Sequence, residues 1–193
     1  MATQGERREQ TRTALLDAAA RLFAERGVDG ASVDAIAEAA GRTSGALYDH
    51  FGSKDGLLFA LLDGWVDDLA VVISAELVHA DTFEDRVAAL WRNFVDPSVG
   101  DGRWIALEHE LWSYAVRHEP VRAHLAERYR AAWAGIDDDW AAATGGPGSG
   151  PIVIGMLLGL EMVRRVDPDA MTDEMAVAAI SRAVSRTNTG ART

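Results

Sequence analysis

The fold of this chain is restricted most by residues 32–54, which read SVDAIAEAAGRTSGALYDHFGSK. Ser32 is a typical N-cap for a short helix, and Gly41 stands where that helix has to end in left-handed backbone geometry. Thr43 can then cap a second short helix. Two short helices joined by a glycine turn form a helix-turn-helix unit, whose second helix enters the major groove of DNA. The pattern therefore predicts a DNA-binding segment.

Side chains at set positions of this segment, together with two leucines that follow it, form a specific pattern. They are Ser32, Val33, Ile36, Ala37, Ala40, Gly41, Gly45, Leu47, Tyr48, His50, Phe51, Ser53, Lys54, Leu57 and Leu58. This pattern resembles the N-terminal DNA-binding domain of the TetR family of transcriptional regulators. The helix expected over Thr11–Gly27 matches as well, so the resemblance covers residues 8–60. The rest of the chain resembles the family only in its length and its helical pattern.

Apolar residues recur every three or four positions through most of the remaining sequence, which indicates amphipathic helices. Further helices are expected over residues 54–78, 82–97, 103–117, 120–144, 152–166 and 172–186, whereas residues 1–5 should be frayed. No stretch alternates as a β-strand does, so we predict an all-α fold of about nine helices. The resemblance divides this fold into a three-helix helix-turn-helix DNA-binding domain over residues 1–53 and a helical effector-binding and dimerisation domain over residues 54–193.

The composition excludes several classes of protein. The 193 residues, 48% of them hydrophobic, can bury a core, and the lack of cysteine rules out disulfides, thiolate catalysis and zinc–sulfur sites. No apolar run is long enough to span a bilayer, so we expect a cytoplasmic protein without a membrane partner. The net charge of −11 argues against general affinity for nucleic acids. However, residues 1–60 carry 7 basic and 9 acidic side chains against 12 and 21 in the remainder, so most of the acidic excess lies outside the predicted DNA-binding domain.

The start of the second short helix is expected to read DNA bases, through Arg42, Thr43, Ser44 and Ala46. An arginine can bridge O6 and N7 of guanine, and such a contact contributes roughly 1–3 kcal/mol of discrimination. Backbone N–H groups at the helix starts after Ser32 and Thr43 can in addition bind phosphates.

The family resemblance implies phosphate contacts for three further residues, Tyr48, His50 and Lys54. The alternative for the aromatic cluster is that it only fills a small core, which is the role we expect of Leu47 and Phe51.

The segment departs from the family pattern at positions that matter for DNA binding. Many relatives have lysine in place of Ser44, a hydroxyl residue in place of Ala46 and tyrosine in place of Asp49. Asp49 would repel a phosphate, so we expect it to face away from DNA or to pair with an arginine. Our hypothesis is that Arg42 supplies the specificity that is lost at Ser44.

Large aromatic side chains are frequent in the second part of the sequence, and Glu108 and His109 lie among them on the helix expected over residues 103–117. A buried carboxylate or imidazole needs a partner, and a cavity with a few polar groups is typical of a ligand site. A satisfied pair in an ordinary core is the alternative. The predicted ligand pocket comprises Trp65, Trp91, Phe94, Glu108, His109, Trp112, Trp133 and Met156.

An apolar stripe with two glycines marks the helix expected over residues 152–166, and the last helix offers a second apolar surface. Glycines weaken a helix, so the close approach of another helix is a plausible reason for them. The family resemblance implies that both helices join a two-fold four-helix dimer interface, whereas packing within one chain is the alternative. The predicted interface residues are Ile152, Gly155, Gly159, Met162, Val177, Ile180 and Val184.

Enzymatic motifs are not found. His109-Glu110 begins like a zinc protease motif, but the second histidine is replaced by Ser113. We therefore expect no catalytic residue, metal or cofactor, and a helical enzyme that has kept the N-terminal domain is the alternative outside regulation.

The expected function is that of a homodimeric, sequence-specific DNA-binding regulator. The resemblance implies a repressor that a small-molecule effector releases from a double-stranded operator, with the long helix over residues 54–78 changing the spacing of the two DNA-reading helices. A dimeric regulator that senses no small molecule is the alternative.

Overall fold

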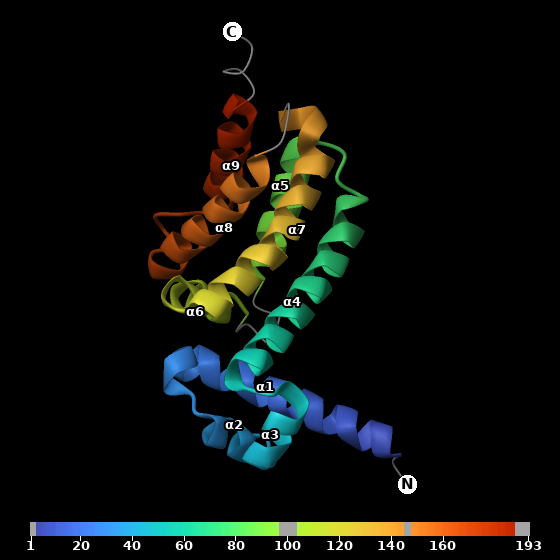
Figure 1. The fold of residues 1–193 in the computed structure, drawn as a ribbon. Coiled ribbons are helices and arrows are strands. Elements are labelled where there is room, and N and C mark those ends of the chain that lie inside the picture. Colours follow the sequence, from blue (N-terminus) through green and yellow to red (C-terminus); the bar gives the residue numbers. More distant parts are fainter. Residues whose placement is uncertain (1–2, 97–103, 145–147, 188–193) are drawn as a thin grey trace. The chain divides into compact units, whose positions relative to one another are not determined.

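The computed structural model describes residues 3–96, 104–144 and 148–187, and Figure 1 shows the course of the chain. These ranges contain nine α-helices and no β-strand, which confirms the predicted all-α fold. The helices are α1 (Gln4–Gly30), α2 (Val33–Ala39), α3 (Ser44–Phe51), α4 (Lys54–Leu77), α5 (Phe83–Val95), α6 (Trp104–Arg117), α7 (Glu119–Thr144), α8 (Ser149–Val166) and α9 (Asp173–Thr187).

The contacts within the chain divide it into two compact units. The first unit comprises Met1–Asp67 and Pro97–Leu125, and the second comprises Asp68–Asp96 and Ala126–Thr193. The first unit therefore holds α1, α2 and α3 together with α6, whereas α5, α8 and α9 belong to the second. The boundary expected between residues 53 and 54 stays a prediction.

The first helix begins earlier than predicted. Thr3 and Glu6 form a capping box, in which the Thr3 hydroxyl accepts the N–H of Glu6 at 3.2 Å and the Glu6 carboxylate accepts the N–H of Thr3 at 2.6 Å. The expected fraying is therefore wrong for the described residues 3–5, because the box satisfies backbone groups at the helix start. Near its end α1 is kinked at Gly27, whose φ of +73° is a left-handed value that favours glycine.

The predicted helix-turn-helix unit forms with the expected caps. The Ser32 hydroxyl accepts the N–H of Ala35 at 3.1 Å at the start of α2, and the Thr43 hydroxyl accepts the N–H of Ala46 at 3.2 Å at the start of α3. Gly41 between them has a φ of +63°, as a glycine turn requires. The caps and the turn together fix where each short helix begins and ends.

Apolar side chains from all three N-terminal helices hold this unit together. The contacts of α1 with α2 and α3, and of α2 with α3, enclose a small core. Its fully buried members are Leu15, Ala19, Phe23, Val28, Ile36 and Leu47. All residues of α3 are among those that the structure describes, and Leu47 alone of them is buried. Its side chain therefore anchors α3 to this small core.

In the second unit α5, α8 and α9 pack against one another. Thr82 and Asp85 form the predicted capping box at the start of α5, with aspartate in the place of the usual glutamate. The core is formed by Val87, Trp91, Val153, Leu157, Ala176, Ile180 and Val184, all nearly or fully buried.

The start of α8 lies before the predicted residue Ile152. The Asp137 carboxylate accepts the N–H groups of Gly148 and Gly150 at 2.9 and 2.8 Å, and it thereby caps the helix from a neighbouring turn of α7. A Cβ atom on Gly150 would lie 2.5 Å from the carbonyl oxygen of Trp133, so a glycine is required where α8 begins against α7.

Candidate nucleic-acid interface and a buried carboxyl group

The α3 helix presents one side to solvent and buries the other. Leu47 has no exposed surface, whereas the next residue, Tyr48, is 53% exposed. Asp49 is exposed as well, and His50 and Phe51 are half-buried. The polar tips of Tyr48 and His50 therefore belong to a helix whose orientation is fixed by an apolar anchor.

The Arg42 side chain precedes α3 and is held by hydrogen bonds to its surroundings. Its Nε donates to the Thr11 hydroxyl of α1 at 3.2 Å, and its Nη1 donates to the carbonyl of Gly41 at 3.0 Å. The residue is exposed, so its guanidinium lies on the surface of the first unit at the start of α3. A second arginine, Arg12, lies over the ring of Phe51 at 4.9 Å and connects α1 to the end of α3.

Ser44, the first residue of α3, forms a side-chain hydrogen bond with Asp34, which is not among the predicted DNA-binding residues. Its hydroxyl donates to the Asp34 carboxylate at 2.5 Å. Asp34 lies in the first turn of α2, where acidic residues are common, and this position alone gave no reason to single it out. The predicted base-reading residues Arg42, Thr43, Ser44 and Ala46 therefore lie together at one end of α3, with Asp34 beside them.

Lys54 starts α4 and is half-buried. The eight predicted DNA-binding residues all belong to the first unit: Ser32 immediately precedes α2, Arg42 and Thr43 precede α3, and Lys54 is the first residue of α4. The other four, Ser44, Ala46, Tyr48 and His50, lie on α3. The role of all eight in DNA binding stays a prediction.

The end of α1 is held by side chains of α6. The Glu110 carboxylate accepts the N–H of Val28 at 3.0 Å, and Arg117 pairs with Asp29 at 3.3 Å. The His118 ring, which stacks on Tyr114, lies 3.8 Å from the same aspartate. Sequence reasoning missed these contacts, because nothing in the local pattern connects α6 to a turn more than 80 residues earlier.

Glu108 on α6 is fully buried. The Trp112 indole N–H donates to its Oε1 at 2.7 Å, and no group of the described residues donates to its Oε2. Burial raises the pKa of the Glu108 carboxyl from 4.5 to about 7, against the lowering effect of the Trp112 hydrogen bond. A buried acceptor without a donor is costly, which distinguishes this carboxyl group from the exposed acidic residues of the chain.

The other residues of the predicted ligand pocket are divided between the two units. Trp65, Glu108, His109 and Trp112 belong to the first, and Trp91, Phe94, Trp133 and Met156 belong to the second. Within the second unit the Trp91 indole donates to Asp173 at 2.9 Å, and Trp91 is almost fully buried. The pocket therefore stays a prediction.

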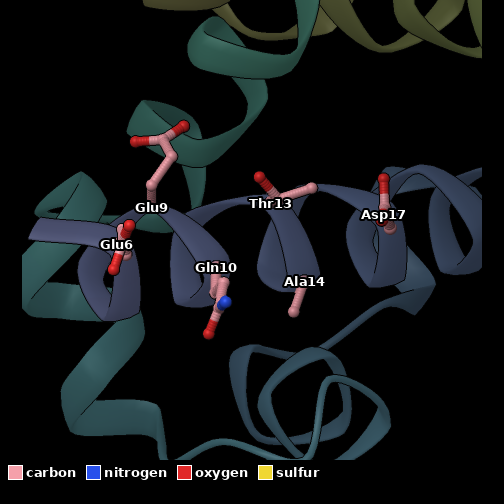
Figure 2. Close-up of a pocket in the computed structure, with 6 residues that line it drawn as sticks. All are labelled: Glu6, Glu9, Gln10, Thr13, Ala14 and Asp17. Carbon is pink, nitrogen blue, oxygen red and sulfur yellow. The ribbon is translucent and has the colours of Figure 1, made fainter. Parts of the chain in front are cut away.

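A groove lies on the surface of α1 (Figure 2). It is lined by Glu6, Glu9, Gln10, Thr13, Ala14 and Asp17. Figure 2 shows Glu9, Thr13 and Asp17 rising from the same side of the helix. Its three carboxylates would repel phosphate, and none of the predicted DNA-binding or pocket residues lines it.

The predicted dimer residues differ in exposure. Ile152 and Met162 on α8 are 40% and 50% exposed, and a Cβ atom on Gly155 or Gly159 would meet no atom within 4 Å. Ile180 and Val184 on α9 have no exposed surface, so the prediction needs correction at these two residues: they pack inside the second unit. Val177 is half-buried. Val166, which belongs to the predicted apolar stripe, and Val163, which does not, are also exposed on α8.

None of the helices in the described ranges combines the length and the hydropathy that a bilayer-spanning segment needs.

Comparison with known proteins identifies a family model and several relatives that match part of the chain. Residues 15–61 match the family model for bacterial regulatory proteins of the tetR family. The transcriptional repressor KstR2 of Rhodococcus jostii is 55% identical over 58 residues, which cover 30% of this chain and 28% of that protein. The transcriptional repressor AcnR of Corynebacterium glutamicum is 32% identical over 130 residues, or 67% of this chain and 59% of that protein. The matched region thus spans less than two thirds of either relative.

Solved structures match over nearly the whole chain. A TetR-family transcriptional regulator from a Rhodococcus species has a TM-score of 0.72 and 28% identity, with 93% of this chain and 98% of that one covered. The multidrug binding protein EbrR, solved as a complex with imidazole, has a TM-score of 0.71 and 25% identity, with 94% and 96% covered.

Proposed function

Because the chain belongs to the tetR family of bacterial regulatory proteins, we propose that it is a transcriptional repressor that binds operator DNA through α3. The observation that carries this proposal is the anchoring of α3, since Leu47 is fully buried while Tyr48 beside it is 53% exposed. The helix is thus fixed to the core on one side and open on the other, as a helix that enters a major groove must be. The two relatives, both repressors, support the direction of regulation.

The contacts with DNA divide into two kinds. Arg42, Thr43, Ser44 and Ala46 read base edges from the start of α3, while Tyr48, His50 and Lys54 bind phosphates. Backbone N–H groups after Ser32 and Thr43 add phosphate contacts. The fixed caps of α2 and α3 support this assignment, because they determine which backbone groups lie at the helix starts.

A small-molecule effector releases the repressor by binding at α6. Two observations in the first unit support this step: Glu108 keeps one buried oxygen without a donor, and the same helix holds the end of α1 through Glu110 and Arg117. A ligand that bonds to Glu108 and shifts α6 would act on α1, against which α2 and α3 pack. The complex of EbrR with imidazole supports a small-molecule site in this fold.

A regulator that senses no small molecule is the second candidate. One observation favours it, because Trp112 lies one helical turn after Glu108 and already donates to it, as in an ordinary core pair. Thermal unfolding against a panel of candidate ligands separates the two. An effector stabilises the folded chain, and substitution Glu108→Gln reduces that stabilisation.

The repressor acts as a homodimer in the cytoplasm and catalyses no reaction. The exposed apolar residues Ile152, Met162, Val163 and Val166 on α8 support self-association. Two symmetry-related copies of α3 would then read two half-sites of one operator.

An electrophoretic mobility-shift assay with the DNA upstream of the chain's own gene tests DNA binding. We expect a shift with the natural fragment and a weaker one with a scrambled fragment. Substitution Arg42→Ala should lower the ratio of the two affinities about 5- to 150-fold, the equivalent of 1–3 kcal/mol. Arg21→Ala removes the same charge from an exposed position of α1 and should leave the ratio unchanged. No shift with any upstream fragment would contradict the proposal.

A further inference from the structure

A hydrogen bond between the two short helices places an acidic side chain next to the predicted base-reading residues. Asp34 lies in the first turn of α2, and Ser44 is the first residue of α3. The Ser44 Oγ and the Asp34 Oδ1 are 2.5 Å apart. Asp34 is exposed and Ser44 is half-buried, so the pair lies at the surface of the first unit.

The direction of this hydrogen bond follows from the chemistry of the two groups. An ionised carboxylate has no proton and can only accept, whereas a serine hydroxyl has one proton and two lone pairs. Ser44 must therefore donate its proton to Asp34. Its remaining lone pairs can only accept hydrogen bonds, and the carboxylate next to it can also only accept.

We infer that Asp34 determines the base preference of Ser44, restricting this serine to base edges that donate a hydrogen bond, adenine N6 or cytosine N4. The inference rests on the proposed function, because it requires the start of α3 to enter a major groove. A serine without such a partner can turn its proton to either kind of edge and discriminates poorly. Asp34 is thus a positioning residue, which acts on the base through Ser44.

The neighbouring Arg42 has the opposite polarity. A guanidinium only donates, so it matches the acceptors O6 and N7 of guanine. Arg42 and Ser44 stand two positions apart on either side of the Thr43 cap. A donor-only and an acceptor-only side chain at one helix end define an operator that combines a guanine with an adenine or a cytosine at a nearby step.

Selection from a random double-stranded DNA library by the full chain tests this inference. Three variants are compared with the unchanged protein at one fixed salt concentration: Asp34→Ala, Ser44→Ala and Glu38→Ala. Glu38 is exposed one helical turn after Asp34 on α2, so its substitution removes the same charge from the same helix. Thermal unfolding followed by circular dichroism verifies that each variant is folded.

We expect the unchanged protein to select a motif with one base pair at which adenine or cytosine is preferred on the strand that faces Ser44. Both Asp34→Ala and Ser44→Ala should relax the preference at that base pair by about fivefold or more, the lower end of what one base contact contributes. Glu38→Ala should leave every preference unchanged. A general rise in affinity on loss of the Asp34 charge would apply to all sequences alike and would not alter the motif.

Two results would overturn the inference: an unchanged motif with Asp34→Ala, or a change at a base pair that Ser44→Ala does not affect. If the unchanged protein selects no motif at all, the proposed DNA-binding function fails, and this outcome is distinct from a motif that is insensitive to Asp34.

Discussion

The carboxylate of Glu110 accepts a hydrogen bond from the backbone N–H of Val28 at 3.0 Å, although the two residues are 82 positions apart in the chain. The bond lies at the kink of α1, directly after Gly27, whose φ is +73°. It connects α6 to the helix against which α2 and α3 pack, all within the first unit. The kink and the carboxylate that caps it are therefore one structural feature.

Substitution Glu110→Ala should destabilise the folded chain. It removes the acceptor of a partly buried backbone N–H, and the loss of a hydrogen bond to a charged group corresponds to about 1.5–3 kcal/mol in the free energy of unfolding. Chemical denaturation measures this change. Glu110→Gln keeps an acceptor of the same length and should recover at least half of the loss. Equal destabilisation by both variants would show that the charge of Glu110 matters and not its hydrogen bond.

Substitution Gly27→Ala should destabilise the chain for two separable reasons. The backbone of Gly27, with φ +73° and ψ 162°, strains an alanine by about 1–3 kcal/mol, and the new Cβ would lie 2.9 Å from the Glu110 Oε1. The second cost disappears when Glu110 is also alanine, so the double variant should be more stable than the sum of the single changes predicts. Additive free energies of unfolding would contradict this coupling.

Local features of the DNA-binding segment could be predicted from the sequence. The Ser32 and Thr43 caps and the left-handed Gly41 each depend on residues at most three positions away. The pairs Asp34–Ser44 and Glu110–Val28 could not be predicted, because they connect different helices and neither partner is unusual in its own segment.

The last helix illustrates a second limit. Its apolar stripe includes Ile180 and Val184, and such a stripe looks the same whether it packs within its own chain or against a second copy. Only the structure shows that these two residues are enclosed by their own unit. The exposed apolar residues on α8 lie on a different face of the helix from the buried Val153 and Leu157. Because both faces are apolar, the sequence alone does not tell which of them is covered by the same chain.

Substitution Met162→Glu should weaken self-association without unfolding the chain. Met162 is 50% exposed on α8, and a two-fold interface would contain it twice. Loss of its burial in both copies should raise the dissociation constant of the dimer at least about tenfold. Sedimentation velocity over a range of protein concentrations measures this constant.

Val71→Glu is the matched control for this experiment, since Val71 is 71% exposed on α4 and lies outside the predicted interface. Ile180→Glu should instead unfold the second unit, because it places a charge in the core. A dimer as stable with Met162→Glu as with Val71→Glu would exclude α8 from the interface.

Substitution Glu108→Gln should stabilise the chain in a pH-dependent manner. Burial raises the pKa of Glu108 from 4.5 to about 7, so between these values the folded chain keeps a proton that the unfolded chain has released. The free energy of unfolding therefore falls as the pH rises through this window, and the contribution of the protonated group is fully present only below about pH 4.5. Glutamine does not titrate, so the variant should exceed the original protein by about 3 kcal/mol at pH 8, and the difference should fall to about 1 kcal/mol at pH 5. Urea denaturation at the two pH values measures it, with the exposed Glu127→Gln on α7 as the control for a change in net charge. A difference that is equal at pH 5 and pH 8 would mean that Glu108 is ionised in the folded chain throughout this range.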